Sequence, residues 1–598
     1  MGGIAGCIDY QSTPRTEVQQ LSAGLEHRGK GSQGVFSEGP ISMVFRQLSK
    51  AAEAPPTVLQ NDTWAIVLDG QLYNFSLQSF LQAWTEKKIA MLSEVCGPFV
   101  FAAWNRTSET LYLVRSREGS RPLFWSHKDD KLAFCSELPP LLKLPFVSRE
   151  LAIEHLAEQL SFRYVHAPRT LIHDIHSLPA GFVLTLQNKK ANMTQWWQPR
   201  WYAVDAPVPS PNEVVERLQE LLRRSVERCL RSNQEVGILL SGGVDSSAIL
   251  YQTSILQNPP QTFTVALEES PGDESPFAAR VAKMMAAPNH RIQISNNELI
   301  DSFERATEYM GQPLPTAAGV VQLLFFQKIR SAVRVLLSGD GGDEVLGGRS
   351  MPLLASHIER VKQIDKLPYL GKRIVRGIAR RLGQKDLAAS YSQFGMERSI
   401  GASRIFLAPD RIDILTDPGL VRPGIRQRIL TPFYQEVDSD PINEILYVWQ
   451  RGWLAEDSLA RSDRMSMSQQ VEVRYPMLDT DLVSYCASIP GHLKVRRTML
   501  DYIPKWPLRE MMGTKLPKQL IHRPKRTLLH PLDRWLRNQG EKFLQLHVAE
   551  IRQNLPHIFV PKMVERLAAE HLSKQHNHGM RLWTLILFSI WHEKFIGR

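Results

Sequence analysis

The stretch Ser241-Gly242-Gly243-Val244-Asp245-Ser246-Ser247 lies between an apolar run, 236–240, and a helix-like segment that begins at residue 248. This order predicts a buried strand, a tight glycine turn and then the first turn of a helix. The glycines let the backbone approach a ligand closely, and the N–H groups of the helix start point at that ligand. Hydroxyl groups add donors for phosphate oxygens, and Asp245 supplies a carboxylate for a metal ion on the phosphate.

Two further apolar runs, 261–267 and 333–337, alternate with helix-like segments. Such alternation predicts a parallel sheet with crossover helices, in which ligands bind at the carboxyl ends of the strands. The second run leads into another glycine-rich turn, Ser338–Gly348, which holds three acidic residues among five glycines. Those acids would repel a polyphosphate unless a divalent cation lay between them, so we predict Asp245 and Asp343 as ligands of Mg²⁺.

Length and composition set the broad class of the protein. The chain has 598 residues, too many for a single core. Its net charge of +11 suits ATP, pyrophosphate or a peptide, and we expect no nucleic-acid partner because aromatic residues are not interleaved with the basic ones. We find neither a signal peptide nor an apolar run of the roughly eighteen residues that span a membrane. Five scattered cysteines without a C-x-x-C pair favour a reducing, cytoplasmic location.

The chain divides near residue 205. Short apolar runs and turns before about residue 200 are typical of layered sheets, and the proline-rich segment 203–212 is the best linker candidate. We therefore predict two domains, 1–205 and 206–598. The second begins with a helix and a parallel sheet, and its pattern after residue 350 is mostly helical.

Charged segments follow the parallel sheet. Asp463-Arg464-Met465 and the run 471–479 alternate charged with apolar residues, which predicts half-buried polar groups near the site. A proline-bounded loop then carries Arg523-Pro524-Lys525-Arg526. A lysine on that loop would neutralise charge on the transferring phosphorus or on a tetrahedral oxyanion.

The first loop resembles the pyrophosphate-binding loop of ATP pyrophosphatases. Together with the later segments, in this order, it resembles the synthetase domain of the asparagine synthetase family. The resemblance implies adenylation of a carboxylate by ATP with Mg²⁺, release of pyrophosphate and attack by an amine. It places Leu239, Ser241, Val265 and Gly339 in the adenosine pocket, Gly242, Gly243, Asp245, Ser246 and Ser247 in the phosphate loop, and Lys525 beside the transition state.

The N-terminal segment resembles the glutaminase half of the same family, a class II amidotransferase of αββα type. Family members begin Met-Cys-Gly-Ile, and the cysteine attacks glutamine, whereas this chain has Gly2 at that position. Cys7 is five residues further on, and we interpret it as a small buried hydrophobe. The family's H-R-G-P-D is changed to His27-Arg28-Gly29-Lys30-Gly31. We therefore hypothesise a structural domain that supplies no ammonia.

Two branches of the family fit an N-terminal domain that supplies no ammonia, the lasso-peptide cyclases and the β-lactam synthetases. The β-lactam branch carries a tyrosine in the second glycine turn, where this chain has Asp340. We favour a lasso-peptide cyclase, with Asp340 and Glu472 as candidates for removing a proton from the amine. This branch implies a precursor peptide as substrate, with a leader-peptide protease and a leader-recognition protein as partners. An ammonia-using asparagine synthetase, a β-lactam synthetase-like enzyme and a non-catalytic nucleotide-binding relative are the alternatives.

Overall fold

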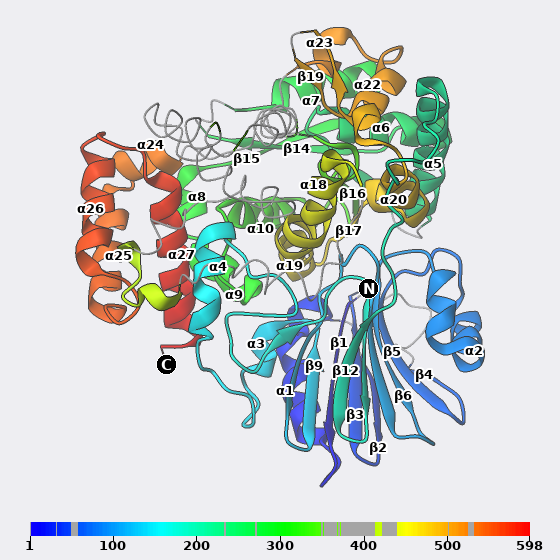
Figure 1. Cartoon of the computed structure of the whole chain (residues 1–598), viewed down its shortest axis with the longest axis vertical. Helices are drawn as coiled ribbons and strands as arrows, with labels where there is room; N and C mark the ends of the chain where they lie inside the picture. The colour runs from blue at the N-terminus through cyan, green and yellow to red at the C-terminus, as the bar shows by residue number, and fades with distance from the viewer. Residues whose placement is uncertain are drawn as a thin grey trace.

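The structure is a computed structural model. It describes residues 2–30, 33–48, 58–231, 235–268, 272–348, 351, 368, 371, 413–420, 439–499, 501–523 and 532–597. Figure 1 shows a β-rich N-terminal part beneath a C-terminal part in which helices surround a second sheet region. This arrangement confirms the predicted combination of a sheet sandwich with a parallel-sheet domain.

The N-terminal part contains two six-stranded sheets. The first has the order β10-β8-β9-β1-β3-β2, and the second has the order β12-β11-β7-β6-β5-β4. The strands of the first are β1 (Gly2–Asp9), β2 (Gln33–Glu38), β3 (Ile41–Gln47), β8 (Phe124–Lys128), β9 (Lys131–Cys135) and β10 (His176–Ser177). Those of the second are β4 (Leu59–Gln60), β5 (Trp64–Gly70), β6 (Phe99–Asn105), β7 (Thr110–Arg115), β11 (Phe182–Gln187) and β12 (Lys190–Gln195).

The sheets are packed face to face, with helices against both outer surfaces. Ile4 and Met43 of the first sheet share a buried cluster with Val100 of the second. Helix α1 (Arg15–Gly24) covers the other face of the first sheet, and α2 (Leu77–Lys87) covers the other face of the second. Strand β1 is buried along its whole length because it has α1 on one side and the second sheet on the other. This is the αββα order that the sequence predicted.

The C-terminal sheet is parallel throughout, with the order β15-β14-β13-β16-β17. Its strands are β13 (Val236–Leu239), β14 (Thr262–Leu267), β15 (Asn289–Ile294), β16 (Val335–Leu337) and β17 (Glu472–Arg474). Helix α5 (Pro211–Leu230) precedes the sheet and begins with a capping box between Ser210 and Glu213. The crossover and turn helices are α6 (Val244–Leu256), α7 (Ser275–Met284), α8 (Asn296–Ile300), α9 (Phe303–Met310), α10 (Ala318–Ile329) and α11 (Gly342–Leu346).

Helices dominate the rest of the described chain. Helix α18 (Pro441–Trp449) continues through a π-helical stretch, η5 (Gln450–Leu459), into α19 (Ala460–Ser468), which lies where the two parts of the molecule meet (Figure 1). The others are α3 (Leu138–Leu141), α4 (Leu156–Phe162), α20 (Thr480–Ala487), α21 (Gly491–Lys494), α22 (Trp506–Met512), α23 (Lys518–Ile521), α24 (Leu532–Arg537), α25 (Glu541–Asn554), α26 (Pro561–Leu572) and α27 (Gly579–Phe595), with the short ribbon β18 (Arg496–Arg497) and β19 (Tyr502–Ile503). Among the described residues, none of these helices is long and apolar enough to cross a membrane.

Candidate active site

The first glycine loop connects β13 to α6 at the carboxyl edge of the parallel sheet. Gly242 has a φ of +69°, and a Cβ there would lie 2.6 Å from the backbone nitrogen of Ala278, so the position requires glycine. Ser241 Oγ accepts a hydrogen bond from the N–H of Gly243 (3.2 Å), and Ser246 Oγ accepts one from the N–H of Ser241 (3.2 Å). The hydroxyls therefore fix the shape of the loop, with Gly243 as the N-cap of α6.

The second glycine turn, after β16, lies directly against the first. A Cβ on Gly339 would lie 3.0 Å from the backbone nitrogen of Ser246, and a Cβ on Gly342 would lie 2.5 Å from Asp245 Oδ1. Side chains at these glycines would push the two loops apart. The structure thus brings Asp245 next to the acidic turn that contains Asp343, although the two residues are 98 positions apart in the sequence.

A buried lysine joins the two turns. The ammonium of Lys505 lies 2.5 Å from Asp245 Oδ2 and 2.7 Å from Asp343 Oδ1, and only 3% of its side chain is exposed. Lys505 has a left-handed backbone (φ 54°, ψ 38°) at the N-cap of α22, and a Cβ on Gly348 would lie 2.4 Å from its Cε. The two carboxylates therefore converge on one positive charge.

The same two carboxylates fit a divalent cation. Asp245 Oδ1 is buried and has no hydrogen-bond partner among the described residues, which leaves a carboxylate oxygen available to a ligand. Carboxylate oxygens are the ligands that Mg²⁺ prefers, and this ion commonly completes its shell with water and phosphate oxygens. The donor set at this position therefore suits Mg²⁺ on a polyphosphate.

An open cavity of about 430 Å³ lies in front of these residues. Its walls include Gly243, Val244, Asp245, Asp343, Gly348, Asp501, Tyr502, Ile503, Pro504, Lys505, Arg509, Leu520, Ile521, His522 and Arg523. The guanidinium of Arg523 bonds Glu274 Oε1 (2.6 Å) and Ser241 O (3.3 Å), so the basic segment predicted after residue 522 begins at the cavity. Lys525, on the same segment, lies outside the described residues.

The residues predicted for the adenosine pocket lie at the same edge of the sheet. Leu239 ends β13 opposite Phe263, and Val265 lies two positions further along β14. Both side chains are half-buried, whereas most of their strand neighbours are fully buried. In the phosphate loop, Ser247 Oγ is buried and has no hydrogen-bond partner among the described residues. Asp340 is half-buried and accepts a hydrogen bond from Ser338 Oγ (2.9 Å).

Glu472 is not brought to Asp340. The register of β16 and β17 places Glu472 beside Val335, whereas the turn begins beyond Leu337, which is beside Arg474. Glu472 pairs with Arg474, whose guanidinium bonds the carbonyl oxygens of Cys229 (2.6 Å) and Arg231 (2.9 Å) at the end of α5. Its carboxylate thus faces the opposite edge of the sheet, which corrects the expectation that it helps Asp340 remove a proton.

Asp463 also lies elsewhere than expected. The alternation around 463–465 predicts half-buried polar groups near the site, but Asp463 is fully buried, points from α19 toward the N-terminal domain and binds Arg28 and Arg121. Burial alone would raise the pKa of its carboxyl, and the two guanidinium groups together hold that pKa below its usual range. Asp463 is therefore part of the contact between the domains.

The position of the family's glutaminase nucleophile is closed. The N–H of Gly2 donates to Asp69 Oδ1 (2.8 Å), and a Cβ on Gly2 would lie 1.6 Å from the carbonyl oxygen of Arg46. Cys7 is 1% exposed within the core. Burial raises the pKa of its thiol, and the nearby carboxylates of Glu17 and Asp9 raise it further, so the reactive thiolate form is disfavoured. The interpretation of Cys7 as a small buried side chain is confirmed.

Two family sequence patterns match the chain. The asparagine synthase pattern covers residues 217–593, and the glutamine amidotransferase domain pattern covers residues 1–81 and 77–197. The first match alone spans more than half of the chain. The chain belongs to the asparagine synthase family. Like other members of this asparagine synthase family, it is an ATP-dependent carbon–nitrogen ligase that forms AMP.

Three known proteins match the chain over at least nine-tenths of its length. Asparagine synthetase 1 (glutamine-hydrolyzing) of Bacillus subtilis (strain 168) is 24% identical over 99% of this chain and 96% of its own. A putative asparagine synthetase of Mycobacterium tuberculosis (strain ATCC 25618 / H37Rv) is 26% identical over 97% of this chain and 94% of its own. Amidase chry2 of Gibberella zeae is 22% identical over 90% of both chains.

Sequence reasoning missed Lys505 and Arg509. Arg509 lines the cavity and is held by the carbonyl oxygens of Pro504 (2.7 Å) and Ile521, while burial lowers its pKa despite the nearby Asp245 carboxylate. The local sequence signal around Lys505 and Arg509 is the pair of prolines at 504 and 507, which predicts a turn followed by the start of a helix. Nothing in that signal points to residues 260 positions away.

Proposed function

We propose that this ligase is a lasso-peptide cyclase. It adenylates the side-chain carboxylate of an Asp or Glu in a precursor peptide and joins it to the N-terminal amine of the same peptide, releasing AMP and pyrophosphate. A leader-peptide protease and a leader-recognition protein are its proposed partners. The observation that carries the proposal is the contrast between a built polyphosphate site at Asp245 and Lys505 and a closed nucleophile position at Gly2.

The N-terminal domain lacks the means to release ammonia from glutamine. Residue 2 has no thiol, and the carbonyl oxygen of Arg46 occupies the place where its side chain would begin. Arg28, which bonds the carbonyl of Gly2, is bonded in turn to Asp463 of α19. Charged side chains thus occupy the contact between residue 2 and the synthetase domain, and the amine has to come from another source.

We assign the activation step to the cavity at the carboxyl edge of the sheet. The loop Ser241–Ser247 and the N-terminus of α6 bind the phosphates, while Leu239, Val265 and Gly339 contact the nucleoside. Asp245 and Asp343 hold Mg²⁺, which when bound supplies positive charge to the leaving pyrophosphate.

The cations around the cavity have a matching role. The substrate carboxylate attacks the α-phosphorus of ATP, and pyrophosphate leaves. The oxygens of the leaving pyrophosphate are bound by Lys505, Arg509 and Arg523. Lys525 stabilises the charge that develops at the α-phosphorus. The amine then attacks the acyl-adenylate carbon and AMP leaves, with Asp340 accepting the proton. Without activation a carboxylate and an amine do not condense in water, and an enclosed site keeps water from the adenylate.

An ammonia-dependent asparagine synthetase is the second candidate. What favours it is that the asparagine synthetases of B. subtilis and M. tuberculosis align with more than nine-tenths of both chains. A β-lactam synthetase-like reaction is less favoured because Asp340 stands where that branch has tyrosine. In an asparagine synthetase reaction the nitrogen comes from free ammonium and the activated carboxylate belongs to aspartate.

A paired peptide assay separates these candidates. The chain is incubated with ATP, Mg²⁺ and a short precursor peptide encoded beside its gene, trimmed to a free N-terminal amine, and in parallel with the N-acetylated form of that peptide. We expect the free peptide to lose one water with formation of one AMP, and the acetylated peptide to support only pyrophosphate exchange. A third incubation replaces the peptide with aspartate and ammonium. Asparagine formed there, with both peptides unchanged, would overturn the proposal.

A further inference from the structure

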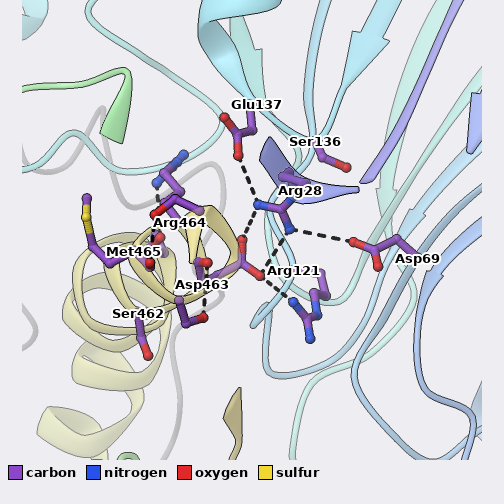
Figure 2. A network of polar contacts seen from close by, with 12 residues as sticks. Arg28, Asp69, Arg121, Ser136, Glu137, Ser462, Asp463, Arg464 and Met465 are labelled. Carbon is purple, nitrogen blue, oxygen red and sulfur yellow. Dashed lines mark hydrogen bonds and ion pairs between the residues drawn. The ribbon is translucent and has the colours of Figure 1, made fainter. Parts of the chain in front are cut away.

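Six buried charged residues meet where the N-terminal domain contacts α19 (Figure 2). They are Arg28, Arg121, Arg464, Asp69, Glu137 and Asp463. Three guanidinium groups and three carboxylates balance one another, which is the condition under which buried charges are tolerated. None of these side chains lines the nucleotide cavity.

Arg28 is the centre of this cluster. Its guanidinium bonds Asp463 through two nitrogens, at 2.7 Å and 3.2 Å, and bonds Glu137 Oε1 at 3.1 Å. Its Nε donates to the carbonyl oxygen of Gly2 (2.9 Å), and Asp69 Oδ2 lies 3.7 Å away. A planar fork that reaches four groups at once cannot be replaced by lysine without losing contacts.

Asp463 receives a second arginine from the same domain. The Nη1 atom of Arg121 lies 2.5 Å from Asp463 Oδ1, and the exposed fractions of the two side chains are 4% and 1%. The carboxylate of α19 is thus held from two directions by the N-terminal domain. Removing either guanidinium leaves a buried charge partly uncompensated, which is far more disruptive than breaking an exposed ion pair.

A chain of hydrogen bonds continues from α19 to the second glycine turn. Tyr475 donates its hydroxyl to Ser462 Oγ (2.9 Å), one residue before Asp463. The N–H of Ser338 donates to the carbonyl of Arg474 (2.9 Å), the residue before Tyr475, and Ser338 Oγ bonds Asp340. These bonds connect α19, through the segment 474–475, to the turn that packs against Asp245.

We propose that Arg28 and Arg121 are positioning residues for the synthetase reaction. They fix α19 through Asp463, and α19 fixes the Ser338–Gly342 turn through Ser462 and Tyr475. In this assignment Arg28, from the segment His27–Gly31 that stands in place of the family's H-R-G-P-D, serves to align the ATP site. The N-terminal domain is retained because the synthetase domain needs it for geometry.

The test compares Arg28→Met and Arg28→Lys with Arg117→Met in the full chain. Arg117 is a matched control because it is also a buried arginine, but it bonds the carbonyl oxygens of Leu92, Ser93 and Val95 within its own domain. The readouts are hydrogen exchange of peptides covering α19 and the Ser338–Gly342 turn, and the Kd for ATP with Mg²⁺. Neither readout uses a peptide substrate, so this proposal fails or survives separately from the cyclase assignment.

We expect both Arg28 variants to exchange faster than wild type at α19 and at the turn, and to bind ATP about 5- to 150-fold more weakly, the range of couplings between distant sites. Arg117→Met should exchange faster only in the N-terminal domain and keep the wild-type Kd. If the Arg28 variants do not fold, Arg121→Gln, which leaves the Arg28–Asp463 pair, should give the same pattern. Unchanged exchange at the turn together with an unchanged Kd would overturn the proposal.

Discussion

The ammonium of Lys505 lies 2.7 Å from the carboxylate of Asp343 and bonds Asp245 at the same time. Two carboxylates that close to one another repel unless a cation lies between them. Lys505 supplies that cation from the polypeptide and offsets one of the two negative charges. The lysine is then already beside the position of the pyrophosphate.

Replacing this lysine tests its role directly. Lys505→Met removes a 3%-exposed cation from between two carboxylates, and we expect it to lower the free energy of unfolding by about 3 kcal/mol in EDTA. Excess Mg²⁺ should restore more stability to the variant than to wild type because the ion replaces the missing charge. Urea unfolding with EDTA or Mg²⁺ measures both effects.

Lys515→Met is the control for that experiment, because the Lys515 ammonium lies over the ring of Tyr251 at 5.5 Å and away from the two carboxylates. It should be close to wild type in both buffers. A Lys505→Met protein as stable as wild type in EDTA would show that the ion pairs contribute little.

Asp245→Asn and Asp343→Asn test the proposed metal ligands. Each keeps the shape of the side chain but removes the negative charge that Mg²⁺ requires. We expect AMP formation to fall by at least about 100-fold, a loss typical of a deleted electrostatic group. Chromatography of the nucleotides measures AMP, and circular dichroism checks the fold. AMP formation at the wild-type rate by either variant would remove that residue from the metal site.

Gly2→Cys tests whether the N-terminal domain has lost more than its nucleophile. The new side chain would meet the carbonyl oxygen of Arg46, 1.6 Å from the ideal Cβ position, so β1 would have to shift from β3. We therefore expect no glutaminase activity from this variant. Glutamate release well above that of Gly2→Ala would mean that the cysteine alone is what the N-terminal domain lacks.

The ion pairs of Asp463 predict a pH dependence of stability. The guanidinium groups hold its pKa below the ordinary value of about 3.9, despite burial, so the folded state favours the charged form. This stabilisation is complete above about pH 4 and is lost as the pH falls through the folded pKa. Asp463→Asn should therefore be less stable than wild type at neutral pH by about 3 kcal/mol, and the difference should narrow toward pH 3.

Urea unfolding of both proteins across that pH range measures the difference. Asp413→Asn serves as the control, since its side chain is exposed and it should follow wild type at each pH. A constant difference between Asp463→Asn and wild type from neutral pH to pH 3 would contradict the assigned pairs.

The two glycine turns could be predicted because their signals are local. Each consists of a few consecutive residues after an apolar run, and parallel strands bring such turns to one edge of the sheet. Gly242 and Gly339 are glycines for a reason that the sequence alone suggests, a close approach of backbone. The burial of Cys7 followed in the same way from the apolar residues around it.

Contacts between distant segments could not be predicted. Lys505 is 260 positions from Asp245, and Arg28 is 435 positions from Asp463. The expectation that Glu472 lies near Asp340 shows a second limit. Alternation of charged and apolar residues predicts a half-buried strand but not which end of the strand faces the ligand. The register with Val335 decides that point, and register depends on the whole sheet.

The source of the nitrogen is the most direct test of the central claim. The chain is incubated with ATP, Mg²⁺, its precursor peptide and glutamine labelled with ¹⁵N in the side-chain amide, and the products are analysed by mass spectrometry. We predict AMP, a peptide that has lost one water and carries no ¹⁵N, and glutamine that is unchanged. Label in the product, or accumulation of glutamate, would contradict the account.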